Sequence, residues 1–254
     1  MIGDFYVGLS DEALLSCTVE SVGDSFLIII HRRLFNTLRF FTDVYLSSIL
    51  SIEEKVILLS EYIFAVTSEG PFLADLPIAP RRHSRDELVE ATLLNGNLIR
   101  FLIGHELYHM LPSLSEGFDS SLLPLESTPA WENECKADFF SVTLMLREHG
   151  GELQPRYQTA AVQAPILLLT LLNAIEHLLP DNRNSARAAR SHPDSLLRES
   201  VLTINLTRAY PELLPTLQIA QAQAHLLFEQ IQDYMFENMS CGRTHTDDKS
   251  YGIY

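Results

Sequence analysis

The stretch that decides the fold of this chain is residues 98–110, LIRFLIGHELYHM. Its apolar and histidine positions recur at spacings of three and four, which is typical of one buried helix face: Leu98, Phe101, Leu102, His105 and His109. We therefore predict a helix over residues 86–112. The Asn95-Gly96 pair weakens that helix without ending it, and Pro112 gives it a stop.

Within this stretch, His105-Glu106-Leu107-Tyr108-His109 is an H-E-x-x-H motif. Residues four apart in a helix lie one turn above each other on the same face, so both imidazoles can bind one ion. Glu106 follows the first histidine directly and can reach a water on that ion. A catalytic zinc ion held by two histidines needs a third protein ligand and keeps its fourth position open.

The third ligand is predicted in a second helix, which begins after Thr128 as N-cap with Pro129 at its first position and closes at Gly150-Gly151. Glu134 and Asp138 are four apart there and share a face. One of them can bind the metal, and the other can accept a hydrogen bond from the far nitrogen of a ligand histidine. The alternative is a solvated acidic helix face, which the upstream motif makes the weaker interpretation. Residues 111–128 are predicted to connect the two helices as a loop.

These motifs resemble those of a known family. H-E-x-x-H followed by Glu134-Cys135-Lys136-Ala137-Asp138, an E-x-x-A-D motif, is similar to the gluzincin metallopeptidases of the CAAX prenyl protease and HtpX type. A third element, His192-Pro193 with Arg198 five residues after the proline, is also similar. The resemblance covers three short segments between residues 98 and 198. It implies a zincin-like core with zinc bound by His105, His109 and Glu134, Glu106 as the base, Asp138 supporting a ligand, and His192 and Arg198 bordering the cleft.

Members of that family are usually embedded in membranes, and this chain departs from that pattern. Its best candidate span is the apolar run of residues 164–172, which is too short for a bilayer core of about 20 apolar residues. We expect this run to form a buried helix packed against the catalytic pair. The membrane substrates of the family are therefore not carried over, and no membrane span is predicted.

The third element also has a plainer interpretation. A lone histidine before a proline is most often a loop residue, and four arginines gather here in an acidic chain: Arg183, Arg187, Arg190 and Arg198. They can form a solvated basic stretch, or an anchor for a carboxylate-bearing substrate or an oxyanion. We keep the functional interpretation for His192 and Arg198 alone, because only their spacing matches.

The composition of the chain indicates its size class, its partners and its cellular compartment. The chain has 254 residues, of which 46% are hydrophobic, so it can bury a sizeable core, and its net charge is −15. That charge argues against nucleic acids and anionic membrane surfaces as partners. The three cysteines show no paired spacing and are predicted to be free thiols in a reducing cytosol: Cys17, Cys135 and Cys241. No N-terminal signal segment is visible, and a cytoplasmic location is expected.

The fold class expected from the whole chain is α+β and predominantly α-helical. Two strands, Cys17–Val22 and Ser25–His31, flank Gly23-Asp24 as a hairpin, and the second strand is expected to be buried on both faces. Further helices are predicted over 33–66, 153–179, 193–209 and 212–238. We expect one domain over 1–238, with N-terminal hairpin and helices (1–85), catalytic core (86–200) and C-terminal helices (201–238), followed by a flexible tail (239–254).

These features predict a zinc-dependent endopeptidase that hydrolyses a cytosolic peptide or protein substrate through a zinc-bound water and the base Glu106. The first alternative is a regulator or sensor that keeps a peptidase-like zinc site and acts by binding a partner protein. The second is a structural zinc site, which is weaker because such sites are closed by four protein ligands. The oligomeric state and the substrate sequence are not indicated by any motif.

Overall fold

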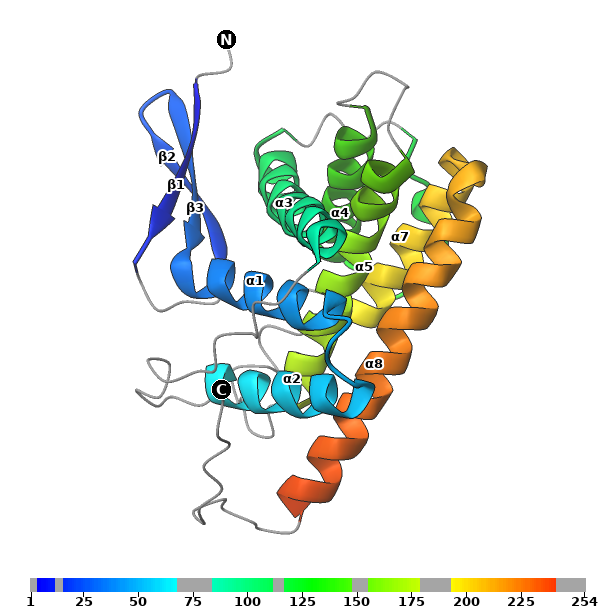
Figure 1. The fold of residues 1–254 in the computed structure, drawn as a ribbon. Helices are drawn as coiled ribbons and strands as arrows, with labels where there is room; N and C mark the ends of the chain where they lie inside the picture. The colour runs from blue at the N-terminus through cyan, green and yellow to red at the C-terminus, as the bar shows by residue number, and fades with distance from the viewer. Residues whose placement is uncertain are drawn as a thin grey trace.

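The computed structural model describes residues 4–11, 16–67, 84–111, 117–147, 155–178 and 193–240. In chain order its elements are β1 (Phe5–Ser10), β2 (Cys17–Val22), β3 (Ser25–His31), α1 (Arg32–Leu46), α2 (Ile52–Thr67), α3 (Arg85–Met110), η3 (Ser120–Leu122), α4 (Pro129–Arg147), α5 (Pro155–Leu178), α7 (Ser195–Ala209), η4 (Pro211–Leu213) and α8 (Leu214–Ser240). Helices dominate and the strands form one small sheet, so the prediction of a mainly helical α+β protein is confirmed (Figure 1).

The predicted hairpin is confirmed with both strands at their expected bounds, because its turn chemistry is local: Gly23 has φ +63, the left-handed region that favours glycine. The sheet gains a strand that the sequence analysis missed, because β1 pairs in parallel with β3 and gives the order β1-β3-β2. Burial of β3 on both faces was wrong. Ile28 and Ile30 are buried, whereas Leu27 and Ile29 on the other face are half-buried.

The predicted helix over 33–66 is two helices, α1 and α2, separated by residues 47–51. The break has a local cause at Ser51, whose hydroxyl accepts the backbone N–H of Glu54 at 3.2 Å. The Glu54 carboxylate in turn accepts the backbone N–H of Ser51 at 2.8 Å. This reciprocal pair is a capping box, and it begins a new helix where the apolar periodicity suggested a continuous one.

The two motif helices form as predicted. A second capping box, between Ser84 and Glu87, begins α3, which runs through Asn95-Gly96 without a break and ends at Met110. The α4 helix begins at Pro129, and the hydroxyl of Thr128 accepts the backbone N–H of Trp131 at 3.3 Å, as expected of an N-cap. The described part of α4 ends at Arg147, so the predicted stop at Gly150-Gly151 lies outside the described residues.

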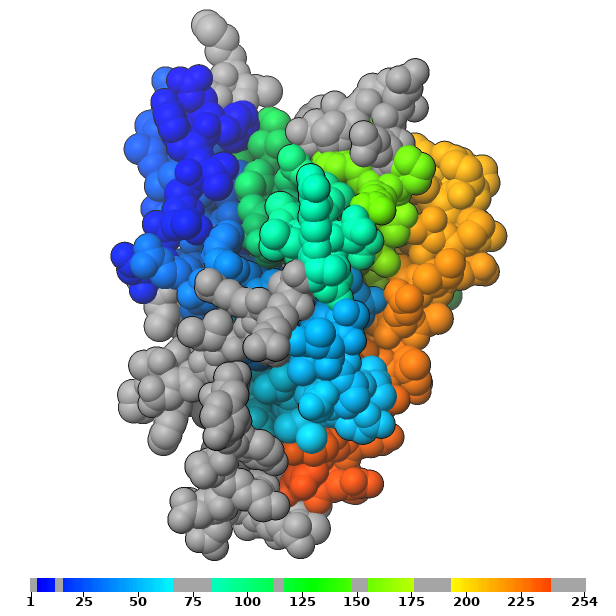
Figure 2. Space-filling model, in the orientation of Figure 1, coloured from blue at the N-terminus to red at the C-terminus, as the bar shows by residue number. Residues whose placement is uncertain are grey.

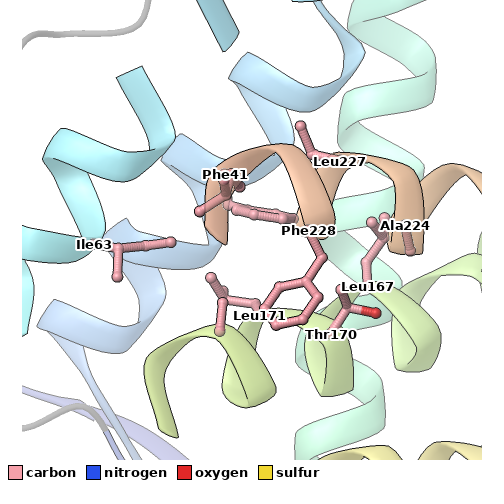
Figure 3. A pocket seen from close by; sticks show the side chains of 10 residues that line it. Phe41, Ile63, Leu167, Thr170, Leu171, Ala224, Leu227 and Phe228 are labelled. Atoms are coloured by element: carbon pink, nitrogen blue, oxygen red, sulfur yellow. The ribbon is translucent and has the colours of Figure 1, made fainter. Parts of the chain in front are cut away.

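The α5 helix lies at the centre of the helical core. In Figure 3, side chains from α5 and three other helices line one small cavity: Phe41 of α1, Ile63 of α2, Leu167 and Leu171 of α5, and Leu227 and Phe228 of α8. The cavity left among them is about 10 Å³, which is too small for a ligand and marks well-packed core.

The α5 helix confirms the helix predicted over 153–179, and it extends well beyond the apolar run of residues 164–172 within it. By length and composition alone, Pro155–Ile175 is the one helix within the described ranges that is long and apolar enough to cross a membrane. In this fold 72% of that apolar window is buried, as expected for a core helix. Buried core helices of water-soluble proteins pass the same test, so this property is weak evidence for a membrane span.

The C-terminal helices are also close to their predicted ranges, as α7 and α8. One hydrophobic core joins buried residues from α1 through α8, among them Leu38, Leu98, Val142, Leu169 and Leu217. The strands form one end of the surface beside α3 (Figure 2). Residues 241–254, the predicted tail, lie outside the described residues.

Candidate metal centre

The centre is built where α3 and α4 pack closely. Gly104 directly precedes His105, and a Cβ atom at Gly104 would lie 2.5 Å from the hydroxyl oxygen of Ser141 and 3.1 Å from its Cα. The same hydroxyl donates to the backbone carbonyl of Phe101 at 2.7 Å. This close approach of the two helix backbones brings the histidines of the motif opposite Glu134 and Asp138.

Three predicted ligands come together as a group that can hold a metal ion. Nε2 of His105 lies 3.1 Å from Nε2 of His109 and 3.3 Å from Oε2 of Glu134. Nε2 of His109 lies 3.5 Å from Oε1 of Glu134. A tetrahedral zinc ion with ligand bonds of about 2.0–2.2 Å separates its ligand atoms by about 3.3–3.6 Å. Each of the three separations is close to this spacing, with Oε2 of Glu134 facing His105 and Oε1 facing His109.

Asp138 orients the ring of the first histidine. Its Oδ1 lies 2.9 Å from Nδ1 of His105, and the Asp138 side chain is fully buried. Although burial alone would raise the pKa of Asp138, the neighbouring Arg198 and His105 lower it to about 2, so Asp138 is a carboxylate that accepts the Nδ1 proton. This hydrogen bond directs Nε2 of His105 towards His109 and Glu134, as metal binding requires.

The two histidines differ in their environment. Burial lowers the pKa of His105, but its hydrogen bonds to Asp138 and Glu134 outweigh burial and raise the pKa to about 9. Burial and the nearby His105 lower the pKa of His109. The His109 side chain is 34% exposed, against 10% for His105 and for Glu134. Solvent therefore reaches the centre from the His109 side.

Arg198 lies behind the ligands, bound to Asp138. Its Nε and Nη2 donate to the two Asp138 oxygens at 2.8 and 2.7 Å, and its Nη1 lies 3.8 Å from Oε2 of Glu134. The two carboxylates raise the pKa of Arg198 although burial opposes the charge. In the structure its guanidinium holds the Asp138 carboxylate and lies beside that of Glu134. Its predicted role at the border of the cleft, as an anchor for an oxyanion, stays a prediction.

The His192-Pro193 step is the other part of the sequence element that contains Arg198. His192 lies outside the described residues, as do Arg183, Arg187 and Arg190. Pro193, which follows His192, is buried.

Glu106 is half-buried on α3, on the side of that helix that approaches strand β2. Burial, and then the charge of Glu106, raise the pKa of the Cys17 thiol to about 12. Cys17 begins β2, so the edge strand β2 lies beside the predicted catalytic base. Sequence reasoning missed this neighbour because no local pattern links residues 17 and 106.

The remaining acidic residue of the motif helix, Glu132, lies away from the ligands. Its carboxylate binds Lys136 at 2.6 Å and the hydroxyl of Ser120 at 2.6 Å. Cys135 is buried and free, as predicted. Burial, followed by the charge of Asp138, raises its pKa to about 12, which agrees with a packing role.

The described part of the connecting loop is held firmly. The backbone N–H of Asp119 donates to Asn205 at 2.7 Å, and the Asp119 carboxylate pairs with Arg208, both on α7. Phe118 packs edge-on against Phe139, one residue after Asp138. The helix that supplies Arg198 thus also anchors this loop, a link that residue spacing along the chain could not reveal.

Comparison of the chain with models of protein families, with curated proteins and with solved structures finds no match. The residues of the centre itself therefore carry the functional interpretation.

Proposed function

We propose that this protein is a zinc-dependent endopeptidase of the gluzincin type, acting on a peptide or protein substrate in the cytoplasm. The observation that carries the proposal is the group of His105, His109 and Glu134, with ligand atoms 3.1–3.5 Å apart. Two imidazoles and one carboxylate form a donor set used by catalytic zinc, which leaves a fourth position for water or substrate.

Solvent access supports a catalytic centre over a structural one. A structural zinc site is closed by four protein ligands, whereas the group among the described residues has three, and His109 is partly exposed. The Asp138–His105 hydrogen bond adds the outer support that ligand histidines of zinc sites usually have.

Each residue then has a defined task. A bound zinc ion would supply a Lewis acid for the scissile carbonyl and lower the pKa of water. Glu106 takes the proton of the attacking water and passes it to the leaving amine. Asp138 holds the tautomer of His105, and Arg198 fixes Asp138. His192 keeps its proposed place at the border of the cleft.

The substrate is proposed to lie along β2. Because the carbonyl of Ser16 accepts the N–H of His31 at 3.2 Å, the even-numbered residues of β2 bond to β3. The N–H and C=O groups of Cys17, Val19 and Ser21 then point to the outer edge of the sheet. An extended peptide can add to this edge next to Glu106 through main-chain hydrogen bonds.

The test compares the wild type with Glu106→Gln, which keeps the shape of the side chain and removes the base. Both proteins are loaded with zinc, their metal content is measured, and each is incubated with a peptide mixture derived from a cellular proteome. We expect about one zinc per chain in both and new peptide termini, found by mass spectrometry, in the wild type only. Equal cleavage by both proteins would remove Glu106 from the reaction. A wild type that binds no zinc would refute the whole assignment.

A further inference from the structure

Within the described residues the sheet has a second edge strand, β1, on the side away from β2, and β1 pairs there with β3 alone. The carbonyl of Asp4 accepts the N–H of Phe26 at 3.0 Å, and in the parallel register Phe5 is opposite Phe26. The even-numbered residues of β1 therefore bond to β3. The N–H and C=O groups of Phe5, Val7 and Leu9 point outward and are suited to pair with another extended chain.

The side chains of this strand continue the buried face of the sheet into solvent. Phe5, Val7 and Leu9 share the face of their partners Phe26, Ile28 and Ile30. Ile28 and Ile30 are buried, but Phe5 is 37%, Val7 54% and Leu9 59% exposed. Figure 2 shows the residues of β1, dark blue, on the surface of the molecule.

Protection against strand pairing is absent from β1. Natural edge strands usually carry a lysine, a proline or a bulge, and Phe5–Ser10 has none of them. An unprotected apolar edge of this kind is typical of a strand that receives a partner.

The charge of the sheet indicates what kind of segment can pair with β1. The described residues from 4 to 31 include four acidic side chains and no lysine or arginine: Asp4, Asp11, Glu20 and Asp24. The first arginine after these residues in the chain is Arg32, which pairs with Asp11 at 2.9 Å. Asp4 and Asp24 lie at the other end of β1 from this pair, because Phe5 is opposite Phe26. A strand with a basic residue at that end would be attracted.

We propose that the outer edge of β1 docks an extended segment of a partner protein by strand addition. The segment carries apolar residues at alternate positions, which pack on Phe5, Val7 and Leu9, and Lys or Arg at its ends, which face the acidic sheet. This surface is separate from the metal centre and does not depend on its activity.

The first part of the test uses the full chain and synthetic peptides of alternating Val and Thr, measured by fluorescence anisotropy. One peptide has Lys at both ends, a second has Glu there, and a third has Lys ends and a central Pro that prevents strand pairing. We expect the first to bind at least about tenfold more tightly than the others, since main-chain hydrogen bonds and charge both contribute. Equal binding of the Lys peptide and its Pro form would overturn the proposal.

The second part locates the binding. Val7→Pro removes an outward N–H and keeps the bonds of β1 to β3, whereas Val7→Thr keeps that N–H and serves as the control. We expect Val7→Pro alone to lose the peptide. Hydrogen exchange of the wild type should show new protection at the amides of Phe5, Val7 and Leu9.

Three results would contradict this location. Protection at Cys17, Val19 and Ser21 without protection at Phe5, Val7 and Leu9 would place the peptide on β2 alone. Unchanged binding by Val7→Pro would exclude the β1 edge. Concentration-dependent dimerisation that Val7→Pro abolishes would make a second copy the occupant. Zinc content and peptide cleavage should be equal in all three proteins, so failure here is distinguishable from failure of the proposed activity.

Discussion

The guanidinium of Arg198 donates hydrogen bonds of 2.7 and 2.8 Å to the two carboxylate oxygens of Asp138. Asp138 in turn accepts a hydrogen bond from Nδ1 of His105. Arg198, 60 positions after Asp138 in the chain, therefore helps to orient a candidate metal ligand. Paired hydrogen bonds of this geometry fix a carboxylate more firmly than a single contact does. The support of the metal centre thus comes from α7, outside the two motif helices.

Loss of Arg198 should therefore destabilise the fold. Arg198→Ala leaves the fully buried Asp138 without its counter-ion, and we expect the free energy of unfolding to fall by about 3–5 kcal/mol. Chemical denaturation measures this change. The matched control is Arg156→Ala, whose partner Asp86 is exposed; it should have close to no effect. Equal losses in the two variants would contradict a special role for Arg198.

Asp138→Asn tests the hydrogen bond to the ligand itself. The amide keeps the volume of the side chain but loses the charge that orients His105 and pairs with Arg198. We expect zinc affinity, measured by competition with a chelator, to fall about ten- to a hundredfold. Unchanged affinity in a folded variant would show that Asp138 does not support the ligand.

The two glutamates near the start of α4, Glu132 and Glu134, should differ in their effect on zinc binding. Glu134→Ala removes a predicted ligand, so purified protein should lose most of its zinc after dialysis, as His109→Ala should. Glu132→Ala removes only contacts to Lys136 and Ser120, so zinc content should stay at the wild-type level. Elemental analysis decides between them. Zinc loss in Glu132→Ala and retention in Glu134→Ala would mean that the wrong carboxylate was chosen.

Gly104 should not tolerate a side chain. In Gly104→Ala the new Cβ would lie 2.5 Å from the Ser141 hydroxyl and 3.1 Å from backbone, so the α3–α4 contact must open. We expect a loss of about 1–3 kcal/mol in stability, and weaker zinc binding. Gly96→Ala on the same helix is the control, since its nearest atom is at 4.0 Å; it should be neutral or gain up to about 1 kcal/mol. Thermal and chemical unfolding compare the pair.

The two described cysteines should react slowly. The thiolate is the reactive form, and a pKa of about 12 for Cys17 and Cys135 leaves little thiolate at pH 8. We expect alkylation by iodoacetamide, followed by site-resolved mass spectrometry, to be at least about a hundredfold slower than in denatured protein. Its rate should rise with pH throughout pH 7–10. A plateau near pH 9 at either site would contradict the raised pKa.

Several features could be predicted because they depend on residues close together in the chain. The β2–β3 hairpin follows from Gly23 and the flanking apolar runs, and α3 follows from the spacing of Leu98, Phe101 and His105. The approach of His105 to His109, at 3.1 Å between their Nε2 atoms, needs only helix geometry. The break between α1 and α2 was also local, since Ser51 and Glu54 carry a capping signal that the apolar periodicity obscured.

The tertiary structure alone decided the rest. Parallel pairing of β1 with β3, the direction of Arg198, and the position of Cys17 beside Glu106 join residues far apart in the sequence. Such contacts depend on how complete elements pack, and residue spacing along the chain does not encode packing. The sequence by itself determined the ligand types and the helices that carry them. Residue spacing left open which carboxylate meets the histidines, and the family resemblance implied Glu134. The packing of α3 on α4, close at Gly104 and Ser141, puts Glu134 beside both histidines and Asp138 behind His105, and α7 adds Arg198.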